Sequence, residues 1–201
     1  MKLNTVEKAL MNNPVRAALQ RHYEAPLLRR LGGTVDGGRV LEVGCGRGAG
    51  TQIILDRFGA GHVTAFDLDP DMVERARHRL ARHIPQRVAL SVGDVTAIDA
   101  TDGTYDAVFD FGIIHHVPDW RAALCEIRRV LKPDGRFLFE EVTRHALQRW
   151  SYRTFLEHPE NDRFSGQEFV AACEQAGLRV GGRWVERFFG DFVIGVASAT
   201  G

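Results

Sequence analysis

Short apolar runs alternate with segments of helical periodicity over most of the chain. The run Tyr105–Phe111 is almost continuously apolar, as expected for a strand that is covered on both faces. The segment Pro118–Leu131 instead carries apolar residues at helical spacing. Strands are predicted at 39–43, 62–66, 87–92, 105–111 and 136–142, and helices at 51–58, 69–82 and 118–131. Because strands and helices alternate, the pattern predicts a parallel sheet with helices on both of its faces.

The two ends of the chain depart from this alternation. Helical patterns at 4–11 and 14–31 precede the first strand. Near the other end, Ser165 and Glu168 have the spacing of a capping box and predict a helix that ends at Gly177. Two β-rich segments, 178–188 and 192–197, then flank the turn pair Gly190-Asp191 and predict a hairpin. This hairpin is expected to add one antiparallel strand at the edge of the sheet.

Composition narrows the class of partners. Lys and Arg together number 26, and so do Asp and Glu, so no general attraction to nucleic acid or to an anionic membrane is expected. The three cysteines, Cys45, Cys125 and Cys173, lie far apart, which favours a reducing compartment and no metal site. No apolar signal core and no run long enough to span a bilayer is present, so we expect a cytoplasmic protein without a transmembrane segment.

The glycine-rich turn after the first strand is the strongest candidate for a ligand site. Gly44, Gly46 and Gly48 leave the backbone open to a ligand, and the next helix directs unpaired N–H groups toward the same place. The turn fits the dinucleotide pattern, and Asp67 ends the second strand, where an acid binds ribose hydroxyls. These features suit NAD as well as any other cofactor that contains adenosine.

Two further carboxylates favour a cofactor that carries amino groups. Glu42 lies inside the first strand, where a buried carboxylate needs a partner. A cationic amino group would supply that partner, whereas a pyrophosphate would be repelled. Asp94 follows the third strand, where its carboxylate is placed to accept a hydrogen bond from an adenine amino group.

Six short blocks extend these observations along the chain. They are Val40-Leu41-Glu42-Val43-Gly44-Cys45-Gly46-Arg47-Gly48, Phe66-Asp67-Leu68-Asp69-Pro70-Asp71-Met72, Gly93-Asp94-Val95, Tyr105-Asp106-Ala107-Val108, His115-His116-Val117-Pro118-Asp119 and Leu131-Lys132-Pro133-Asp134-Gly135. In this order and spacing the chain resembles the class I S-adenosylmethionine-dependent methyltransferases over roughly residues 39–142. Within that family it is most similar to the bacterial small-molecule type, which includes ubiquinone/menaquinone-biosynthesis and phospholipid or phosphobase methyltransferases.

The resemblance implies a fold and a division of the chain. The fold class is α/β, a three-layer Rossmann-like sandwich with a seven-stranded, mostly parallel sheet, one antiparallel strand near the C-terminal edge and N-terminal lid helices. We expect residues 1–201 to form one methyltransferase domain. Its parts are a helical lid (1–36), a cofactor-binding core (37–142), a substrate-wall segment (143–164) and a C-terminal helix with a hairpin (165–201). A monomer or a homodimer is expected.

The resemblance also assigns S-adenosylmethionine to the glycine turn. The backbone of Gly44, Cys45 and Gly46 would contact the methionine portion, with Glu42 oriented toward its amino end. Asp67 would bind the ribose hydroxyls. The product left after methyl transfer would be S-adenosylhomocysteine.

Further positions are assigned to the base and to the reactive methyl. Leu68 and Met72 would lie against the adenine, Asp94 would accept from its amino group, and the N–H of Val95 would serve a ring nitrogen. The pair Phe111-Gly112, just past the fourth strand, would border the methionine and the methyl.

Methyl transfer from a sulfonium is an in-line displacement, so the protein mainly aligns the two reactants, and some acceptors also need a general base. His115 and His116 follow the fourth strand, and His116 matches a catalytic histidine of the phosphobase enzymes. Glu140 lies at the end of the fifth strand. Tyr23 lies on the helix that the family uses as a lid. These four side chains are the catalytic candidates.

The acceptor is expected to be a small molecule, and not nucleic acid. Segment 143–164 interleaves aromatic residues with arginines, which suits an apolar or cationic acceptor. Two alternatives stay open: an enzyme that uses the same cofactor for aminopropyl transfer or cyclisation, and an NAD-dependent oxidoreductase. The sequence leaves the acceptor atom open.

Overall fold

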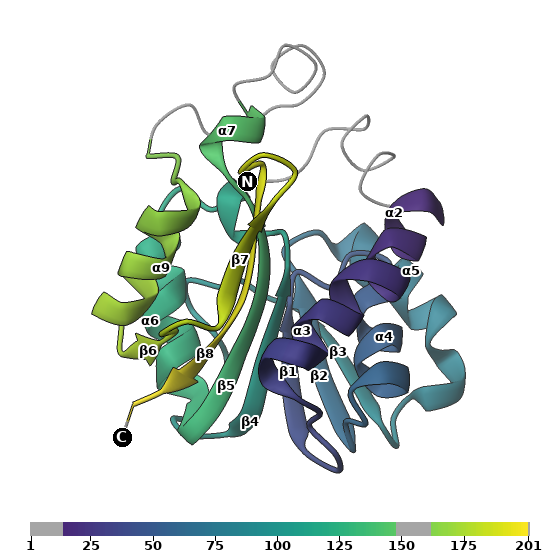
Figure 1. Cartoon of the computed structure of the whole chain (residues 1–201). Helices are drawn as coiled ribbons and strands as arrows, with labels where there is room; N and C mark the ends of the chain where they lie inside the picture. The colour runs from purple at the N-terminus through teal and green to yellow at the C-terminus, as the bar shows by residue number, and fades with distance from the viewer. Residues whose placement is uncertain (1–13, 148–161, 201) are drawn as a thin grey trace.

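The computed structural model describes residues 14–147 and 162–200. Within this part, one sheet lies between two layers of helices (Figure 1). The three-layer arrangement predicted from the alternating pattern is therefore confirmed. The helix predicted at 4–11 and most of the segment 143–164 lie outside the described residues.

The sheet has the strand order β3-β2-β1-β4-β5-β8, and β6 and β7 pair one after the other with the outer edge of β8. Strands β1 to β5 pair in parallel, whereas β8 runs antiparallel to β5. The predicted seven-stranded, mostly parallel sheet with one antiparallel strand near the C-terminal edge is confirmed. The short strands β6 and β7 share the outermost position. The strands are β1 Arg39–Val43, β2 His62–Asp67, β3 Val88–Val92, β4 Tyr105–Phe111, β5 Leu131–Val142, β6 Leu178–Arg179, β7 Trp184–Arg187 and β8 Phe192–Ala199.

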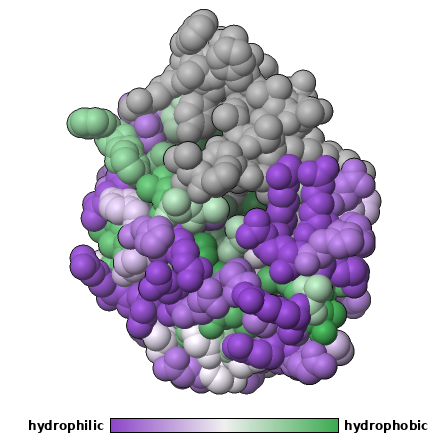
Figure 2. Space-filling model, turned by 90° about the vertical axis from the view of Figure 1, so that its right-hand side faces the viewer, coloured by the Kyte–Doolittle hydropathy of each residue, from purple (hydrophilic) through white to green (hydrophobic). Residues whose placement is uncertain are grey.

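Helices cover both faces of the sheet. One face carries α3 (Ala25–Gly32), α4 (Ala49–Arg57) and α5 (Pro70–Arg79), and the other carries α6 (Trp120–Val130) and α9 (Gly166–Gln175). Figure 2 views the molecule from the side of α3 to α5, where hydrophilic side chains predominate because these helices bury only one side. No helix in the described ranges is long and apolar enough to cross a membrane.

The apolar strands alternate between two cores. Val40 and Phe109 pack with residues of α3 and α4, whereas their neighbours Leu41 and Val108 pack with residues of α6 and α9. Successive side chains of a strand point to opposite faces, so a strand covered on both faces must be apolar at nearly every position. This explains the continuous apolar runs of the sequence.

Side chains cap the starts of α5 and α9, and the cap of α9 is the predicted one. Asp69 accepts a hydrogen bond from the N–H of Asp71 at the start of α5. Ser165 and Glu168 exchange both hydrogen bonds of a capping box at the start of α9. These signals depend on neighbouring residues alone, so the sequence is sufficient to find them.

The helix predicted at 14–31 contains a change of pitch. It consists of α2 (Pro14–Leu19), a π-helical turn (Gln20–Glu24) and α3, and the N–H of Ala25 donates to the carbonyl of Gln20, five residues back. A π-helical turn adds one residue to the helix, and such turns often lie at functional sites. The periodicity of the sequence did not reveal it.

Several predicted boundaries were wrong. The residues between the predicted helix at 118–131 and the predicted strand at 136–142 belong to β5, where Tyr105 pairs with Leu131 and Ala107 pairs with Arg136, so the residues between these pairs bulge. A bulge uses turn residues without ending the strand, which is why the local sequence misleads. Likewise, α5 ends at Arg79 instead of residue 82, where a short 3-10 helix (Ala81–His83) follows. The β-rich segment 178–188 is divided into β6 and β7.

Gly195 in β8 lies between two aromatic neighbours. It pairs with Phe139 of β5 on one side and with Trp184 of β7 on the other. A Cβ atom at this position would lie 2.5 Å from Cζ of Phe139 and 2.8 Å from Cβ of Trp184. The antiparallel edge of the sheet therefore depends on the missing side chain.

We expect Gly195→Ala to lower the free energy of unfolding by about 1–3 kcal/mol, the usual cost of overpacking a core. Urea denaturation measures this change. Gly182→Ala is the matched control, because a Cβ atom there would meet no atom within 4 Å. If both variants unfold at the same urea concentration as the parent protein, the contact of Gly195 with Phe139 is not a packing constraint.

Candidate functional site

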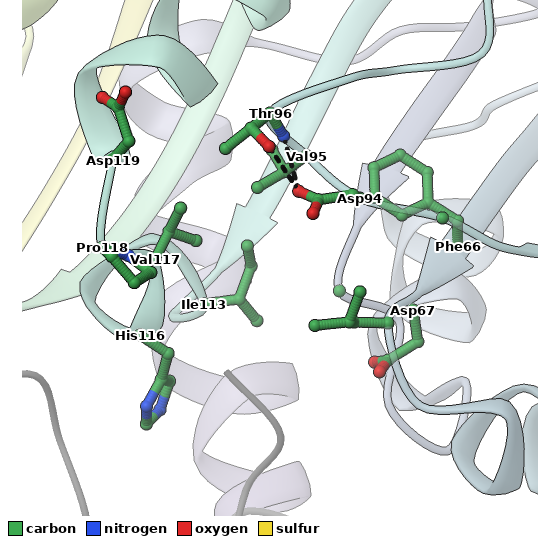
Figure 3. Close-up of a pocket in the computed structure, with 13 residues that line it drawn as sticks. Phe66, Asp67, Asp94, Val95, Thr96, Ile113, His116, Val117, Pro118 and Asp119 are labelled. Carbon is green, nitrogen blue, oxygen red and sulfur yellow. Dashed lines mark hydrogen bonds between the residues drawn. The ribbon is translucent and has the colours of Figure 1, made fainter.

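A cavity of about 320 Å³ opens at the carboxyl ends of β1, β2, β3 and β4 (Figure 3). Figure 3 shows Asp67 and Asp94 on one side of the cavity and His116 on the opposite side. Ligands of parallel sheets bind at this edge. The described residues that line it are Gly44, Phe66, Asp67, Leu68, Gly93, Asp94, Val95, Thr96, Ile113, His116, Val117, Pro118 and Asp119.

The glycine turn after β1 is held by two neighbouring segments. Gly44 has φ 70°, and a Cβ atom on it would lie 2.4 Å from Cγ2 of Ile113, so a side chain is excluded. The N–H of Gly46 donates to Oδ2 of Asp67 at 2.8 Å. The N–H of Cys45 donates to the carbonyl of Phe66, and burial raises the pKa of the Cys45 thiol. The turn thus contributes backbone, and the Cys45 thiol stays protonated.

Asp67 forms the end of β2 and part of the cavity wall. One carboxylate oxygen accepts from Gly46 and the other accepts from the N–H of Asp69 at 2.9 Å. Leu68 lines the cavity and is 40% exposed. Met72, by contrast, is buried in α5 and is not among the described lining residues. The structure therefore brings Asp67 and Leu68 together at the cavity wall, whereas Met72 is buried in α5.

Asp94 and Thr96 form a local turn after β3. Oδ1 of Asp94 accepts from the N–H of Thr96 at 2.9 Å and from its hydroxyl at 2.8 Å, as the dashed lines in Figure 3 show. In the described part of the chain, Oδ2 of Asp94 accepts no hydrogen bond. Val95 is buried and lines the cavity between them. This turn fixes the carboxylate of Asp94 while leaving one of its oxygens for a ligand.

Glu42 is buried at 2% exposure in β1, beside the first turn of α4. Its carboxylate accepts a hydrogen bond from the hydroxyl of Thr51, and a Cβ atom on Gly50 would collide with it. Burial raises the pKa of Glu42 to about 8. Glu42 does not line the 320 Å³ cavity as the described residues define it. It lies behind the glycine turn.

The pair Phe111-Gly112 ends β4 away from the described cavity wall. The Phe111 ring packs beside Gly50 and with the apolar residues of the α4 side. Gly112 has φ 83°, and a Cβ atom on it would lie 3.9 Å from Oε2 of Glu140 and from Cε1 of His115. Gly112 therefore lies where β4, β5 and the histidine turn meet.

The two histidines occupy a short 3-10 helix, Ile114–His116, and face different cavities. His116 lines the 320 Å³ cavity, whereas His115 lines a small cavity of about 10 Å³ next to it. Their ring centres are 4.0 Å apart. Nδ1 of His115 lies 2.6 Å from Oε2 of Glu141, and both side chains are almost fully buried.

Glu140 is linked to the N-terminal helix. Its Oε2 accepts from Arg16 of α2 at 2.5 Å, and the same guanidinium binds Glu24. Burial raises the pKa of Glu24 to about 8 despite this ion pair. The ring of Tyr23 lies 6.0 Å from that of Phe188 at the tip of the β7–β8 hairpin. Glu140 and Tyr23 thus lie where the N-terminal helix meets β5 and the hairpin.

Six of the residues singled out in the sequence share the wall of one cavity: Gly44, Asp67, Leu68, Asp94, Val95 and His116. The other candidates are not among the described residues that line this cavity. Sequence reasoning missed Phe66, Thr96 and Ile113. Phe66 and Ile113 directly precede or follow assigned residues at strand ends, and the Asp94-x-Thr96 pattern is a turn signal. These neighbours of assigned residues are therefore recognisable from the sequence.

Comparisons with known proteins agree with this geometry. The family model described as a methyltransferase domain matches residues 40–135. The malonyl-[acyl-carrier protein] O-methyltransferase of Geobacter sulfurreducens is 31% identical over 187 residues, which make up 88% of this chain and 69% of that protein. Phosphoethanolamine N-methyltransferase 2 of Caenorhabditis elegans is 33% identical over 112 residues, or 56% of this chain and 25% of that protein.

A solved structure extends the similarity to the whole fold. The crystal structure of an S-adenosylmethionine-dependent methyltransferase from Aquifex aeolicus has a TM-score of 0.76 and 25% identity, with 98% of each chain covered. The chain spans 25% to 49% of the length of several curated relatives. The similarity to the Geobacter sulfurreducens enzyme covers more than two thirds of both proteins. The chain belongs to the class I S-adenosylmethionine-dependent methyltransferases, whose cofactor is S-adenosylmethionine.

Proposed function

We propose that this protein transfers a methyl group from S-adenosylmethionine to a small-molecule acceptor. The observation that carries the proposal is the cavity at the carboxyl ends of the parallel strands, whose wall combines the glycine turn with Asp67 and Asp94. An adenosine-containing ligand needs close approach to backbone at one end and hydrogen-bond acceptors for ribose and adenine along its length. These residues supply both.

The hydrogen-bond acceptors and apolar residues of the cavity wall fit the chemistry of the cofactor. Each carboxylate oxygen of Asp67 has two lone pairs, so it can accept from ribose hydroxyls in addition to its backbone partners. Oδ2 of Asp94 is available for the adenine amino group, with Val95 and Leu68 as apolar neighbours. The backbone of Gly44 and the buried Glu42 lie toward the amino-acid end. Met72 and the pair Phe111-Gly112 do not line the wall and would support it from the protein interior.

When bound, S-adenosylmethionine supplies a methyl group on a positively charged sulfur. The chain itself must align the acceptor with that methyl and keep water away. His116 and Ile113 line the cavity opposite Asp67, and we assign them to the wall between cofactor and acceptor. Glu140 and Tyr23, held by the N-terminal helix, would border the acceptor from the other side.

Two observations bear on the acceptor class: the residues beside the histidine turn and the reactions of the relatives. The small cavity beside the histidine turn, of about 10 Å³, is lined by the apolar Val142, Leu147 and Phe164 among others, and also by His115, Asp162 and Arg163. The names of the relatives include both O- and N-methylation. A screen should therefore contain carboxylic acids, alcohols and amines.

Release of S-adenosylhomocysteine with members of such a panel tests the reaction. Product that appears only with an acceptor supports methyl transfer. Release of methylthioadenosine, or consumption of an acceptor without S-adenosylhomocysteine, would favour aminopropyl transfer or cyclisation. Calorimetric binding of NAD but not of S-adenosylhomocysteine would favour the oxidoreductase alternative.

Asp67→Asn is expected to weaken binding of S-adenosylhomocysteine by about 1–3 kcal/mol, because a charged acceptor of the ribose hydroxyls is lost. The amide oxygen can still accept from Gly46, so the glycine turn keeps one of its contacts. Isothermal titration calorimetry measures the affinity. Asp71→Asn, the same charge change on the exposed first turn of α5, is the control and should bind like the parent protein. Equal affinities of all three proteins would remove Asp67 from the site.

Glu42→Gln is expected to change the pH dependence of stability. The pKa of Glu42 is raised to about 8 in the folded chain by burial, from an unfolded value of about 4.5. The folded state therefore binds the proton more tightly, so the free energy of unfolding falls as pH rises from about 5 to 8. The amide removes this titration, and at pH 8 the variant should be more stable by about a few kcal/mol.

Thermal unfolding at several pH values measures this effect. Glu74→Gln, which removes an exposed carboxylate from α5, serves as the control. A variant of Glu42 whose stability depends on pH as steeply as the parent would show that this carboxyl is not the titrating group. Binding of S-adenosylhomocysteine should reduce the pH dependence in the parent, because its ammonium group favours ionised Glu42.

A further inference from the structure

Two buried carboxyl groups hold the turn that carries His115 and His116. Oδ1 of Asp110 accepts from the N–H of Ile113 at 3.0 Å. Glu141 accepts from the N–H of Ile114 at 2.5 Å and from the N–H of His115 at 3.2 Å. Three successive backbone donors are therefore bound by two side chains from β4 and β5. This arrangement fixes the backbone of the turn at the edge of the cofactor cavity.

Asp110 and Glu141 divide one proton and one charge between them. Both are fully buried. Burial, together with the neighbouring Glu141, raises the pKa of Asp110 well above its usual value. Burial raises the pKa of Glu141 only to about 7, because Asp110 and the N–H groups of Ile114 and His115 donate to it. Both oxygens of Glu141 accept from backbone N–H groups, those of Ile114, His115 and Val142, and this geometry assigns the charge to Glu141 and the proton to Asp110.

This charge distribution fixes the tautomer of His115. Oε2 of Glu141 lies 2.6 Å from Nδ1 of His115. An ionised carboxylate can only accept, so Nδ1 carries the hydrogen. In the neutral ring, Nε2 then holds the lone pair. The ring is also confined, because the His115 side chain is 3% exposed and lies against His116.

His115 lies directly beside the wall of the cofactor cavity, in ring contact with His116. It lines the small cavity together with Val142, Leu147 and Phe164, and its partner His116 lines the cofactor cavity. The two rings therefore lie between the cofactor cavity and the residues that directly follow β5. A purely structural role would require Glu141 to accept from the backbone but would not require a particular tautomer of His115.

We propose that Glu141 is a positioning residue, which fixes His115 in the tautomer whose Nε2 accepts the proton that the acceptor releases on methylation. The proposal rests on the proposed function. The acceptor atom forms its bond to the methyl carbon, its proton moves to Nε2, and Nδ1 keeps its own hydrogen. The imidazolium formed is stabilised by the charge of Glu141 and returns the proton to water.

Long-range 1H–15N correlation spectra of the histidine rings test the tautomer without any assay of activity. In the parent protein, His115 is expected to carry hydrogen on Nδ1 and none on Nε2 at a pH where the ring is neutral. The His115→Asn variant identifies the signals by their absence. A parent spectrum with hydrogen on Nε2 of neutral His115 overturns the proposal, whatever the variants do.

Glu141→Gln tests the consequence. Its amide group would donate to Nδ1, so the hydrogen should move to Nε2, as in other cases where an amide replaces an orienting carboxylate. We expect kcat to fall about 100-fold or more, the range for lost general-base catalysis, with the Kd for S-adenosylhomocysteine unchanged. Glu126→Gln is the control, because Glu126 also accepts a backbone N–H, that of Ile98, but lies away from the turn.

Asp110→Asn covers the case in which Glu141→Gln does not fold. The asparagine can still accept from Ile113 and donate to Glu141, so the tautomer and kcat should stay as in the parent. A reversed tautomer or a large loss of kcat in this variant would show that Asp110 carries the charge, which contradicts the proposal. An unchanged kcat in folded Glu141→Gln would overturn it as well. Absence of methyl transfer with every acceptor, beside the expected spectrum, would instead refute the proposed function.

Discussion

Four carboxyl groups are buried close together where β1, β4 and β5 end, and the cost of burying them governs the surrounding structure. An unpaired buried carboxylate costs several kcal/mol, so each needs a proton, a donor or a cation. Their partners are the hydroxyl of Thr51 on α4, the N–H groups of the turn after β4, and the guanidinium of Arg16 on α2. Because these partners belong to separate segments, satisfying the carboxyl groups places α2, α4 and the histidine turn around the strand ends. The four are Glu42, Asp110, Glu140 and Glu141.

Features that depend on neighbouring residues were predictable from the sequence, and those that depend on distant partners were not. The apolar runs predicted β4 with its observed limits, and the Ser165–Glu168 spacing predicted the cap of α9. The bulge in β5 uses residues typical of a turn, so only its pairing with β4 distinguishes the two. The ion pair between Arg16 and Glu140 joins positions 124 apart in the chain, and no local pattern indicates it.

The candidate site likewise contains features that were predictable from the sequence and features that were not. Gly44, Asp67 and Asp94 follow strands, and parallel strands bring their carboxyl ends to one edge, so their meeting at one cavity followed from fold class. The order of the motifs did not predict which cavity each of two adjacent residues lines. His115 and His116 are adjacent in sequence, yet they line different cavities because a 3-10 helix turns by about 120° per residue.

The π-helical turn at Gln20–Glu24 has a consequence for changes in chain length. An α-helix rotates by about 100° per residue, so the additional residue in this turn sets the phase between α2 and α3. Deleting one residue there would restore an uninterrupted α-helix but rotate α2 by that angle relative to the sheet. Arg16 would then leave Glu140, whose carboxylate would stay buried without its cation. The N-terminal helix should therefore tolerate substitutions of its exposed residues far better than insertions or deletions.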